Sequence, residues 1–360
     1  MSATHDLREL GQSLWLDNIT RAMLDDGVIE HYIETRDVTG LTSNPSIFDR
    51  AIATGVYDGA VGDAARRGLT NEDIFFELAI QDLQRAADLF APVHQRTNGV
   101  DGWVSLEVSP QLAYDTARTV DAAQSIHARA DRANLFVKIP GTPPGLAAIE
   151  ECIAAGVAIN VTLLFDADHY RGAAEAYLRG VERRVAQGLD PAVGCVASIF
   201  ISRWDTAVAD AVPDELRNQL GLAVGRDTYR AYRDVLDSDR FQRLANYGAR
   251  AQRLLFASTK TKDPSAPDTL YVSGLAAPFT INTMPDDTLN AFFDHGDVET
   301  SLDRTGGDSA DQLARFDAAG VDRRALAATL QRDGAAAFTS SWTDLLAKID
   351  VRRARVAQRA

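Results

Sequence analysis

One lysine lies in a predicted strand whose other side chains are apolar. Residues 135–140 read Leu-Phe-Val-Lys-Ile-Pro, and Lys138 is the one charged side chain among them. A lysine in a core strand is tolerated when its amine is close to neutral, which is also the state in which an amine attacks a carbonyl carbon. Many strand lysines instead extend their charged end into solvent and have no chemical role. The polar residues of the neighbouring strands favour the first interpretation.

Polar residues recur on one face of seven predicted strands. Side chains alternate between the two faces of a strand, so residues two positions apart lie on the same side. The pairs on this face are Trp15 and Asp17, Thr42 and Asn44, Ser105 and Glu107, Phe136 and Lys138, Asn160 and Thr162, Ser198 and Phe200, and Ser258 and Lys260. Val161 and Leu163 are expected on the opposite face, toward the helices. Two acids and a lysine on an inner face would cost on the order of several kcal/mol in desolvation unless they paired or shared protons, which favours an active site over a structural role.

Short β-rich segments alternate with helical patterns, which is typical of parallel strands joined by crossover helices. Strands are predicted at residues 14–18, 40–44, 103–108, 135–140, 159–165, 194–202, 254–259 and 269–275. Helices are predicted from Thr70 onward and at 110–130, 145–155 and 166–187. Eight strand–helix units favour an α/β fold, a single closed (β/α)8 TIM barrel with extra helices, over an open doubly wound sheet. The active site of such a barrel lies at the C-terminal ends of its strands, where most of these polar residues are found.

The domain organisation is predicted from length and from the absence of linkers. The chain has 360 residues and no stretch rich in Pro, Gly and Ser between the predicted elements. We therefore expect one barrel domain over residues 1–360, with C-terminal helical decoration at about 286–360.

The composition excludes several classes of protein. The net charge is −14, from 37 basic and 51 acidic residues, so the overall field does not attract nucleic acid or an anionic membrane, and a phosphate-bearing substrate needs a local basic cluster. The histidines are scattered and Cys152 and Cys195 stand alone, so we expect no metal site. Two unpaired thiols, a charged N-terminus without an apolar signal segment, and no apolar window of about 20 residues predict a cytoplasmic protein without a membrane span.

Six segments of the chain resemble the transaldolase family, in particular its long, actinobacterial-type branch. Residues 40–48, Gly-Leu-Thr-Ser-Asn-Pro-Ser-Ile-Phe, are similar to the first signature of the family, and residues 137–140 followed by Thr142 are similar to its lysine signature. Residues 14–17, 105–108, 160–165 and 198–203 also match family segments, in the expected order. The matching motifs extend from residue 14 to about residue 285.

The resemblance implies a role for each candidate residue. Lys138 would form a Schiff base with C2 of a ketose phosphate, and Asp17 would take the proton of the C4 hydroxyl when the C3–C4 bond breaks. Glu107 and Thr162 would hold the water that moves protons while the imine forms. The remaining candidates are expected to bind substrate: Asn44, Asn160 and Ser198 the dihydroxyacetone hydroxyls, Arg203 the phosphate, and Thr42, Phe200 and Ser258 other parts of the sugar.

The resemblance also implies a second basic residue that helps to hold the phosphate on the seventh strand. Lys260 and Lys262 are both candidates, because a lysine is a flexible point charge, and the alternative for each is a solvated loop lysine. No cofactor is expected, because a protonated imine by itself stabilises the carbanion left by C–C cleavage.

The function implied is that of a transaldolase of the non-oxidative pentose phosphate pathway. Such an enzyme moves a dihydroxyacetone unit from sedoheptulose 7-phosphate to glyceraldehyde 3-phosphate and gives erythrose 4-phosphate and fructose 6-phosphate. Two alternatives stay open, a lyase similar to fructose 6-phosphate aldolases and an inactive sugar-phosphate binding protein. The related lyases tend to carry glutamine near the position of Glu107 and tyrosine near that of Phe200, so these residue types favour transfer. The expected partners are sugar phosphates, and a homodimer is compatible with the sequence.

Overall fold

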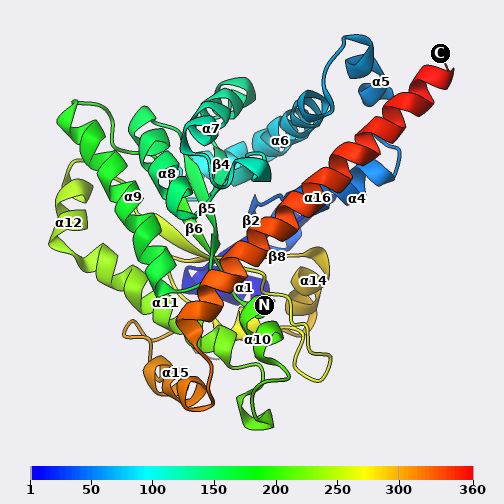
Figure 1. Cartoon of the computed structure of the whole chain (residues 1–360). Coiled ribbons are helices and arrows are strands. Elements are labelled where there is room, and N and C mark those ends of the chain that lie inside the picture. The colour runs from blue at the N-terminus through cyan, green and yellow to red at the C-terminus, as the bar shows by residue number, and fades with distance from the viewer. Residues whose placement is uncertain (1, 299, 360) are drawn as a thin grey trace.

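Eight parallel strands close into a barrel in which each strand pairs with its neighbours in sequence order and β8 pairs with β1 (Figure 1). The computed structural model describes residues 2–298 and 300–359. The strands are β1 (Ser13–Leu16), β2 (Val38–Leu41), β3 (Trp103–Glu107), β4 (Leu135–Pro140), β5 (Ile159–Leu164), β6 (Cys195–Phe200), β7 (Gln252–Ala257) and β8 (Ile281–Met284). The predicted (β/α)8 barrel is therefore confirmed.

Helices surround the barrel and fill the long connections between strands. They are α1 (Ala3–Leu10), α2 (Arg21–Asp25), α3 (Val28–Thr35), α4 (Pro45–Ala53), α5 (Asp58–Arg66), α6 (Asn71–Arg96), α7 (Thr116–Ala130), α8 (Pro143–Ala155), α9 (Ala167–Ala186), α10 (Ser202–Val208), α11 (Leu220–Asp237), α12 (Asp239–Asn246), α13 (Leu270–Gly274), α14 (Asp286–His295), α15 (Ser309–Ala318) and α16 (Arg323–Arg359). Two short 3-10 turns lie at Pro110–Leu112 and Asp214–Leu216.

Capping residues set the ends of the crossover helices. The Thr70 hydroxyl accepts from the amide of Asp73 at the start of α6, and the Thr142 hydroxyl accepts from the amide of Gly145 at the start of α8. The last turn of α8 ends at Gly156, whose φ of 89° is readily adopted by glycine. The sequence predicted the start of α6 after Thr70 and the end of α8 at Gly156, whereas it placed the start of α8 at residue 145, two residues late.

The predicted eighth strand is wrong. Most of residues 269–275 form α13, and the strand that closes the barrel is β8, from Ile281 to Met284. The aromatic and β-branched side chains of 269–275 imitate a strand, whereas β8 has four residues with polar Asn282 in its interior. Pairing with β1 and β7 on either side makes this short segment a strand, and that pairing is not local.

Several predicted boundaries also differ from the structure. The helix expected from residue 110 begins at Thr116, after the 3-10 turn, because Asp115 caps it by accepting from the amide of Arg118. Strand β2 ends at Leu41 rather than at Asn44, because Asn44 caps α4. Strand β7 ends at Ala257, because Ser258 has a φ of 57° that takes it out of the strand conformation.

Leu163, which was expected to face the helices, interrupts the regular alternation of β5. Its φ is 57°, and the register between β5 and β6 shifts between Val161 and Leu164. A Cβ atom at Gly334 of α16 would lie 2.9 Å from Leu163 Cδ2, so the side chain does lie against a helix, in the apolar cluster that contains Phe165 and Phe200. A bulge of this kind turns the following side chains to the other face, which alternation along a regular strand does not anticipate.

Aromatic side chains fill the half of the barrel that lies toward the N-terminal ends of the strands. Trp103 and Phe136 stack with ring centroids 4.0 Å apart, and Trp15 lies 6.2 Å from Phe136. A Cβ atom at Gly40 would lie 2.5 Å from the Trp15 ring, and one at Gly194 would lie 2.8 Å from Trp103. Glycine at these two positions therefore makes room for the indoles, and the barrel interior below Lys138 is a packed core.

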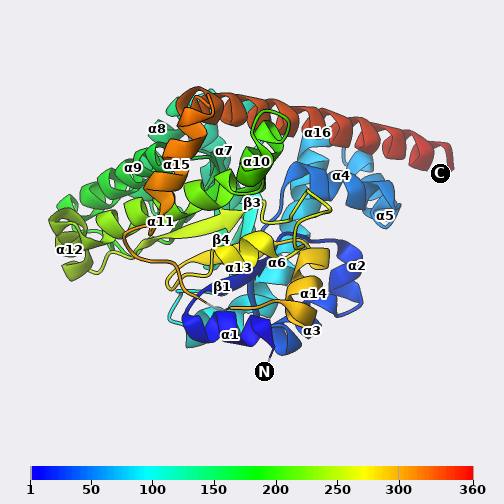
Figure 2. The same ribbon diagram turned by 90° about the horizontal axis from the view of Figure 1, so that it is seen from below.

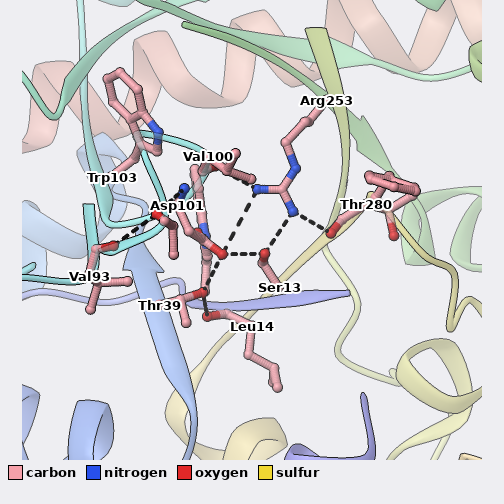
Figure 3. Close-up of polar contacts among 12 residues, drawn as sticks. Ser13, Leu14, Thr39, Val93, Val100, Asp101, Trp103, Arg253 and Thr280 are labelled. Carbon is pink, nitrogen blue, oxygen red and sulfur yellow. Dashed lines mark hydrogen bonds and ion pairs between the residues drawn. The ribbon is translucent and has the colours of Figure 1, made fainter. Parts of the chain in front are cut away.

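Asp101 connects the N-terminal ends of three strands, as Figure 3 shows. Its carboxylate accepts from the hydroxyls of Ser13 in β1 and Thr39 in β2 and from Trp15 Nε1 at 2.7 Å. Arg253 of β7 donates to Ser13 Oγ at 2.7 Å and lies 3.9 Å from Asp101. Asp101 is 6% exposed, so this network satisfies a carboxylate that would otherwise be costly to bury.

A cavity of about 850 Å³ lies at this N-terminal end. Its other two carboxylates are already engaged in ion pairs, Asp37 with Arg8 at 2.6 Å and Asp237 with Arg304 at 2.7 Å. The polar groups of this cavity therefore serve the architecture, and the chemistry-bearing residues lie around a smaller cavity at the opposite end.

The stretch after Pro285 contains α14, α15 and α16; residues 299 and 360 lie outside the described residues. Helix α16 runs along one side of the molecule, and α1 lies on the opposite side (Figure 2). Within residues 2–298 and 300–359, no helix, α16 included, is long and apolar enough to cross a membrane. The single-domain organisation stays a prediction.

Candidate active site

Lys138 and Glu107 face each other at the C-terminal ends of β4 and β3. Their Cα atoms are register partners, and Lys138 Nζ lies 3.4 Å from Glu107 Oε2. The amine also donates to the Ser43 carbonyl oxygen at 3.2 Å. Lys138 is 5% exposed, so the amine is buried as the sequence suggested. Its surroundings are not only apolar, however, because an acidic group lies directly beside it.

Burial raises the pKa of Glu107 to about 7, against the opposing effect of Lys138, and the nearby Asp17 raises it further. Neither carboxylate oxygen of Glu107 has a hydrogen-bond partner among the described residues, since Lys138 approaches it at ion-pair distance without hydrogen-bond geometry. The Thr162 hydroxyl is likewise buried without a partner in the described part of the chain. Buried polar atoms of this kind are usually satisfied by water or by a ligand.

Asp17 follows β1 and points toward the same region. Burial raises its pKa, while Lys138 and the hydrogen bond from Thr42 lower it. Thr42 Oγ1 donates to Asp17 Oδ1 at 2.8 Å, so the Thr42 hydroxyl accepts from Thr283 Oγ1, which lies 2.7 Å away. These two threonines fix one oxygen of the Asp17 carboxylate and leave the other available for a proton.

A chain of polar side chains crosses the barrel below Lys138. Ser198 of β6 donates to Asn160 Oδ1 at 2.7 Å, and Asn160 Nδ2 donates to Ser105 Oγ at 3.1 Å. Asn160 is the Cα partner of Lys138 on β5. The hydrogen bonds fix the orientation of the Asn160 amide and of both hydroxyls, so this row provides an ordered polar surface beneath the amine.

A cavity of about 570 Å³ opens above these groups. It is lined by Asp17, Asn18, Thr42, Asn44, Arg50, Lys138, Ser198, Phe200, Arg203, Ala257, Ser258, Lys260, Lys262, Thr283, Pro285, Asp286, Asp287 and Phe338. The volume suits a small polar ligand.

One end of this cavity is basic. Arg203 makes no hydrogen bond or ion pair with any described residue, and burial lowers its pKa. Partial burial, and then the charge of Lys260, lower the pKa of Lys262. Lys260 forms an ion pair with Asp287, whereas Lys262 has no ion-pair partner in the part of the chain that the structure describes. Three cations around one space are the local basic cluster that an anionic group needs in an acidic protein.

Two further candidates lie at the margin of the cavity. The side-chain oxygen Oδ1 of Asn44 accepts from the amide of Ile47 at 3.1 Å and so caps α4. The Nδ2 group of Asn44 is therefore the part of the side chain left for a ligand. Ser258 lies 2.9 Å, Oγ to Oγ, from Ser202, and its left-handed conformation places it outside the alternation of β7. The prediction that Ser258 and Lys260 lie on the same face of one strand is therefore wrong, although both residues line the cavity.

The structure brings the predicted candidates together at one mouth. Ten of the thirteen line the cavity. Glu107 lies beside Lys138, Asn160 is the register partner of Lys138, and Thr162 lies two residues further along the same strand as Asn160.

The sequence did not point to Thr283 or Phe338. Thr283 was missed because its strand was placed elsewhere in the sequence. Phe338 comes from α16, two hundred residues after Lys138, and no local pattern connects the two. A correct position for the eighth strand would have found Thr283.

The arrangement can support imine chemistry. It places a buried amine beside one carboxyl group whose pKa lies near neutrality and near a second whose pKa is raised, so protons can be given and taken at neutral pH. The basic end of the cavity can bind a phosphate on the same ligand.

Comparisons with known proteins agree with this geometry. The family described as "Transaldolase/Fructose-6-phosphate aldolase" matches residues 14–349. The "Transaldolase" of Arthrobacter sp. (strain FB24) is 42% identical over 357 residues, which cover 96% of this chain and 96% of the relative. The "Transaldolase" of Thermobifida fusca (strain YX) is 42% identical over 97% of both chains, and that of Thiobacillus denitrificans is 43% identical over 97% of this chain and all of the relative.

Proposed function

The chain belongs to the transaldolase/fructose-6-phosphate aldolase family, and we propose that Lys138 carries a dihydroxyacetone unit from sedoheptulose 7-phosphate to glyceraldehyde 3-phosphate. The products are erythrose 4-phosphate and fructose 6-phosphate. The protein is a transferase of aldehyde or ketone residues, as its relatives named transaldolase are. The observation that carries the proposal is the buried Lys138 amine, 3.4 Å from Glu107 in a cavity with a basic end.

The proposed reaction begins when the Lys138 amine adds to C2 of the ketose. Glu107 lies beside the amine, and the oxygens of Glu107 and the Thr162 hydroxyl are buried without hydrogen-bond partners among the described residues. Together they hold the water that carries protons as the carbinolamine loses water to give the imine. Asp17 then takes the proton from the C4 hydroxyl, the C3–C4 bond breaks, and the electron pair moves into the protonated imine to give an enamine. The acceptor aldehyde reacts at C3 of the enamine, and Asp17 returns the proton to the new hydroxyl.

The remaining residues hold the substrate during these steps. Asn160, Ser198 and the amide of Asn44 bind the hydroxyls of the dihydroxyacetone unit, and Arg203 with a lysine binds the phosphate. Phe200 carries no hydroxyl and offers no proton to the enamine. This favours transfer of the dihydroxyacetone unit to an acceptor aldehyde over its release.

Reductive trapping tests the assignment. Incubation with fructose 6-phosphate and borohydride reduces any imine to a stable amine, and peptide mass spectrometry locates it. We expect added mass on the peptide containing Lys138, and the same adduct on a Lys348→Ala control, since Lys348 pairs with Asp49 away from the cavity. An unmodified Lys138 peptide in active protein would overturn the proposal.

The alternative is a lyase that releases free dihydroxyacetone, because the family description includes fructose-6-phosphate aldolases. The two functions differ in what happens to fructose 6-phosphate when no acceptor is present. A transferase forms dihydroxyacetone slowly under these conditions and rapidly gives sedoheptulose 7-phosphate once erythrose 4-phosphate is added. Rapid release that the acceptor does not change would identify the lyase.

A catalytically inactive sugar-phosphate binding protein would keep the cavity but would not need the Lys138 amine. Lys138→Ala separates this possibility from catalysis, provided that the variant keeps the far-ultraviolet circular dichroism of the wild type. If Lys138→Ala keeps its fold but loses turnover, the protein is an enzyme. If the wild type binds sugar phosphates but shows no turnover, the protein is a catalytically inactive binding protein.

A further inference from the structure

Phe338 is the one aromatic residue that α16 contributes to the cavity around Lys138. The buried positions of this part of the helix are 331, 334, 335 and 338, at helical spacing, so one face of α16 lies on the barrel mouth. Phe338 is 7% exposed. The position of a large apolar ring in a cavity otherwise rich in polar groups calls for a physical reason.

The ring lies over both cations that the proposed chemistry uses. Its centroid is 5.9 Å from Lys138 Nζ and 5.9 Å from Arg203 Cζ. Phe200 approaches Arg203 from another side at 5.0 Å and packs against Phe338 edge to face at 6.5 Å. The two rings therefore form one apolar surface beside the guanidinium, and Phe338 extends this surface over the amine.

Contacts on both sides of Phe338 fix its position. One side is anchored by Gln331, which donates to the carbonyl oxygens of Leu163 at 3.0 Å and Gly141 at 3.1 Å. On the other side, Trp342 packs edge to face on Phe75 at 4.7 Å, and Lys348 donates to Asp49 at 2.7 Å. The ring is thus held over the mouth by an anchored helix, without need of a closing loop.

We propose that Phe338 is a retention residue, which shields the Lys138 enamine from water and so favours transfer to an aldehyde over release of dihydroxyacetone. The inference rests on the proposed function and adds to it a specificity determinant from the C-terminal helix.

The reaction that Phe338 suppresses is protonation of the carried enamine. When C3 of the enamine takes a proton, it becomes the protonated imine of dihydroxyacetone. Water then adds to C2, the C–N bond of the carbinolamine breaks, and the products are free dihydroxyacetone and the Lys138 amine. The same hydrolysis frees the product of transfer, so the two fates differ in the first step, and an apolar ring above the enamine keeps water from donating a proton to C3.

The test measures how one intermediate divides between two fates. With fructose 6-phosphate as donor, the rate of dihydroxyacetone release without acceptor is compared with the rate of transfer to erythrose 4-phosphate. Both products come from the same enamine, so their ratio does not depend on the fraction of folded enzyme. The variants are Phe338→Ala, Phe338→Leu and Phe338→Tyr. The control is Phe316→Leu, because Phe316 is fully buried in the same apolar cluster on α15 but does not line the cavity.

We expect Phe338→Ala to raise the ratio of release to transfer by about threefold to tenfold, the effect of losing one cation–π contact and its shielding. Phe338→Leu should fall between alanine and wild type. Phe338→Tyr should also raise the ratio, because its hydroxyl can donate a proton to the enamine. Phe316→Leu should stay near wild type. An unchanged ratio in Phe338→Ala, or an equal rise in Phe316→Leu, would overturn the inference. A wild type that neither transfers nor forms the borohydride adduct would instead overturn the proposed function.

Discussion

Glu107 and Lys138 are register partners on neighbouring strands, and their charged ends lie 3.4 Å apart inside the barrel. Both side chains are at least nine-tenths buried. The pair is therefore held in a medium where charge is costly, and burial raises the pKa of Glu107 to about 7 despite the adjacent amine. This environment gives one carboxyl group access to both protonation states at neutral pH.

The rate of imine formation should depend on the ionisation of Glu107. With a pKa of about 7, the carboxylate that accepts a proton becomes populated as the pH rises from 6 to 8. We expect the rate of borohydride trapping to rise over this range in the wild type. Glu107→Gln should lower the rate by roughly a hundredfold or more, as expected for a general acid–base group, and flatten the rise. An unchanged pH profile in Glu107→Gln would exclude this role.

Glu107 should also make stability depend on pH. Its pKa is raised in the folded protein from 4.5 to about 7, so between these values the native state holds a proton that the unfolded state has lost. The stabilisation of the folded state by this extra proton on Glu107 is complete below pH 4.5 and is lost as the pH rises through 7. Between pH 5 and pH 8 the wild type should lose roughly 2 to 3 kcal/mol relative to Glu107→Gln, measured by urea unfolding at both values. A constant difference between the two proteins would contradict the assignment.

Asp101 should be important for stability and not for chemistry. Asp101→Ala leaves Trp15 Nε1 and the Ser13 and Thr39 hydroxyls without their acceptor and removes the carboxylate beside Arg253, which should cost about 3 to 5 kcal/mol in urea unfolding. The matched control is Asp237→Ala, whose carboxylate pairs with Arg304 on the surface and should cost less than about 1 kcal/mol. The activity per folded Asp101→Ala molecule should remain close to wild type, and equal losses in the two variants would argue against the network.

Lys262, rather than Lys260, should bind the substrate phosphate. Lys260 is engaged with Asp287, whereas Lys262 lies in the field of Arg203 and Lys260, so an anion relieves a repulsion at Lys262. We expect Lys262→Ala to raise the KM for fructose 6-phosphate by about tenfold, and Lys260→Ala to raise it by less than about threefold. Neither variant should change the KM for unphosphorylated fructose. The reverse order for fructose 6-phosphate would assign the phosphate to Lys260.

Gly334 should maintain the position of Arg203. A Cβ atom at this position of α16 would lie 2.9 Å from Arg203 Nη1 and 2.9 Å from Leu163 Cδ2, so Gly334→Ala displaces the guanidinium. The KM for fructose 6-phosphate should rise about threefold to tenfold, the effect of weakening one charge-assisted contact.

The control for Gly334→Ala is Gly59→Ala, in α5, where an added Cβ meets no atom within 4 Å among the described residues. This change should stabilise the protein by about 0.5 to 1 kcal/mol in urea unfolding and leave the KM unchanged. A normal KM in Gly334→Ala would show that Arg203 is free to shift without loss.

Much of the fold could be predicted because its signals are local. The alternation of Ser105 with Glu107 and of Asn160 with Thr162 identified the inner face of two strands, and Gly156 marked the end of one helix. The eighth strand could not be predicted in this way. The interior of β8 carries Asn282, and pairing with β1 and β7 makes the segment a strand.

The sequence by itself determined the barrel, the inward direction of Lys138, Glu107 and Asp17, and the family resemblance, because each depends on short patterns or on residue identity. The tertiary structure decided which distant groups meet at the amine. Phe338 reaches Lys138 because α16 is anchored across the barrel mouth, and Lys262 differs from Lys260 because only Lys260 forms an ion pair with Asp287. Contacts between residues far apart in the chain depend on the packing of whole helices and strands, and no local pattern specifies them.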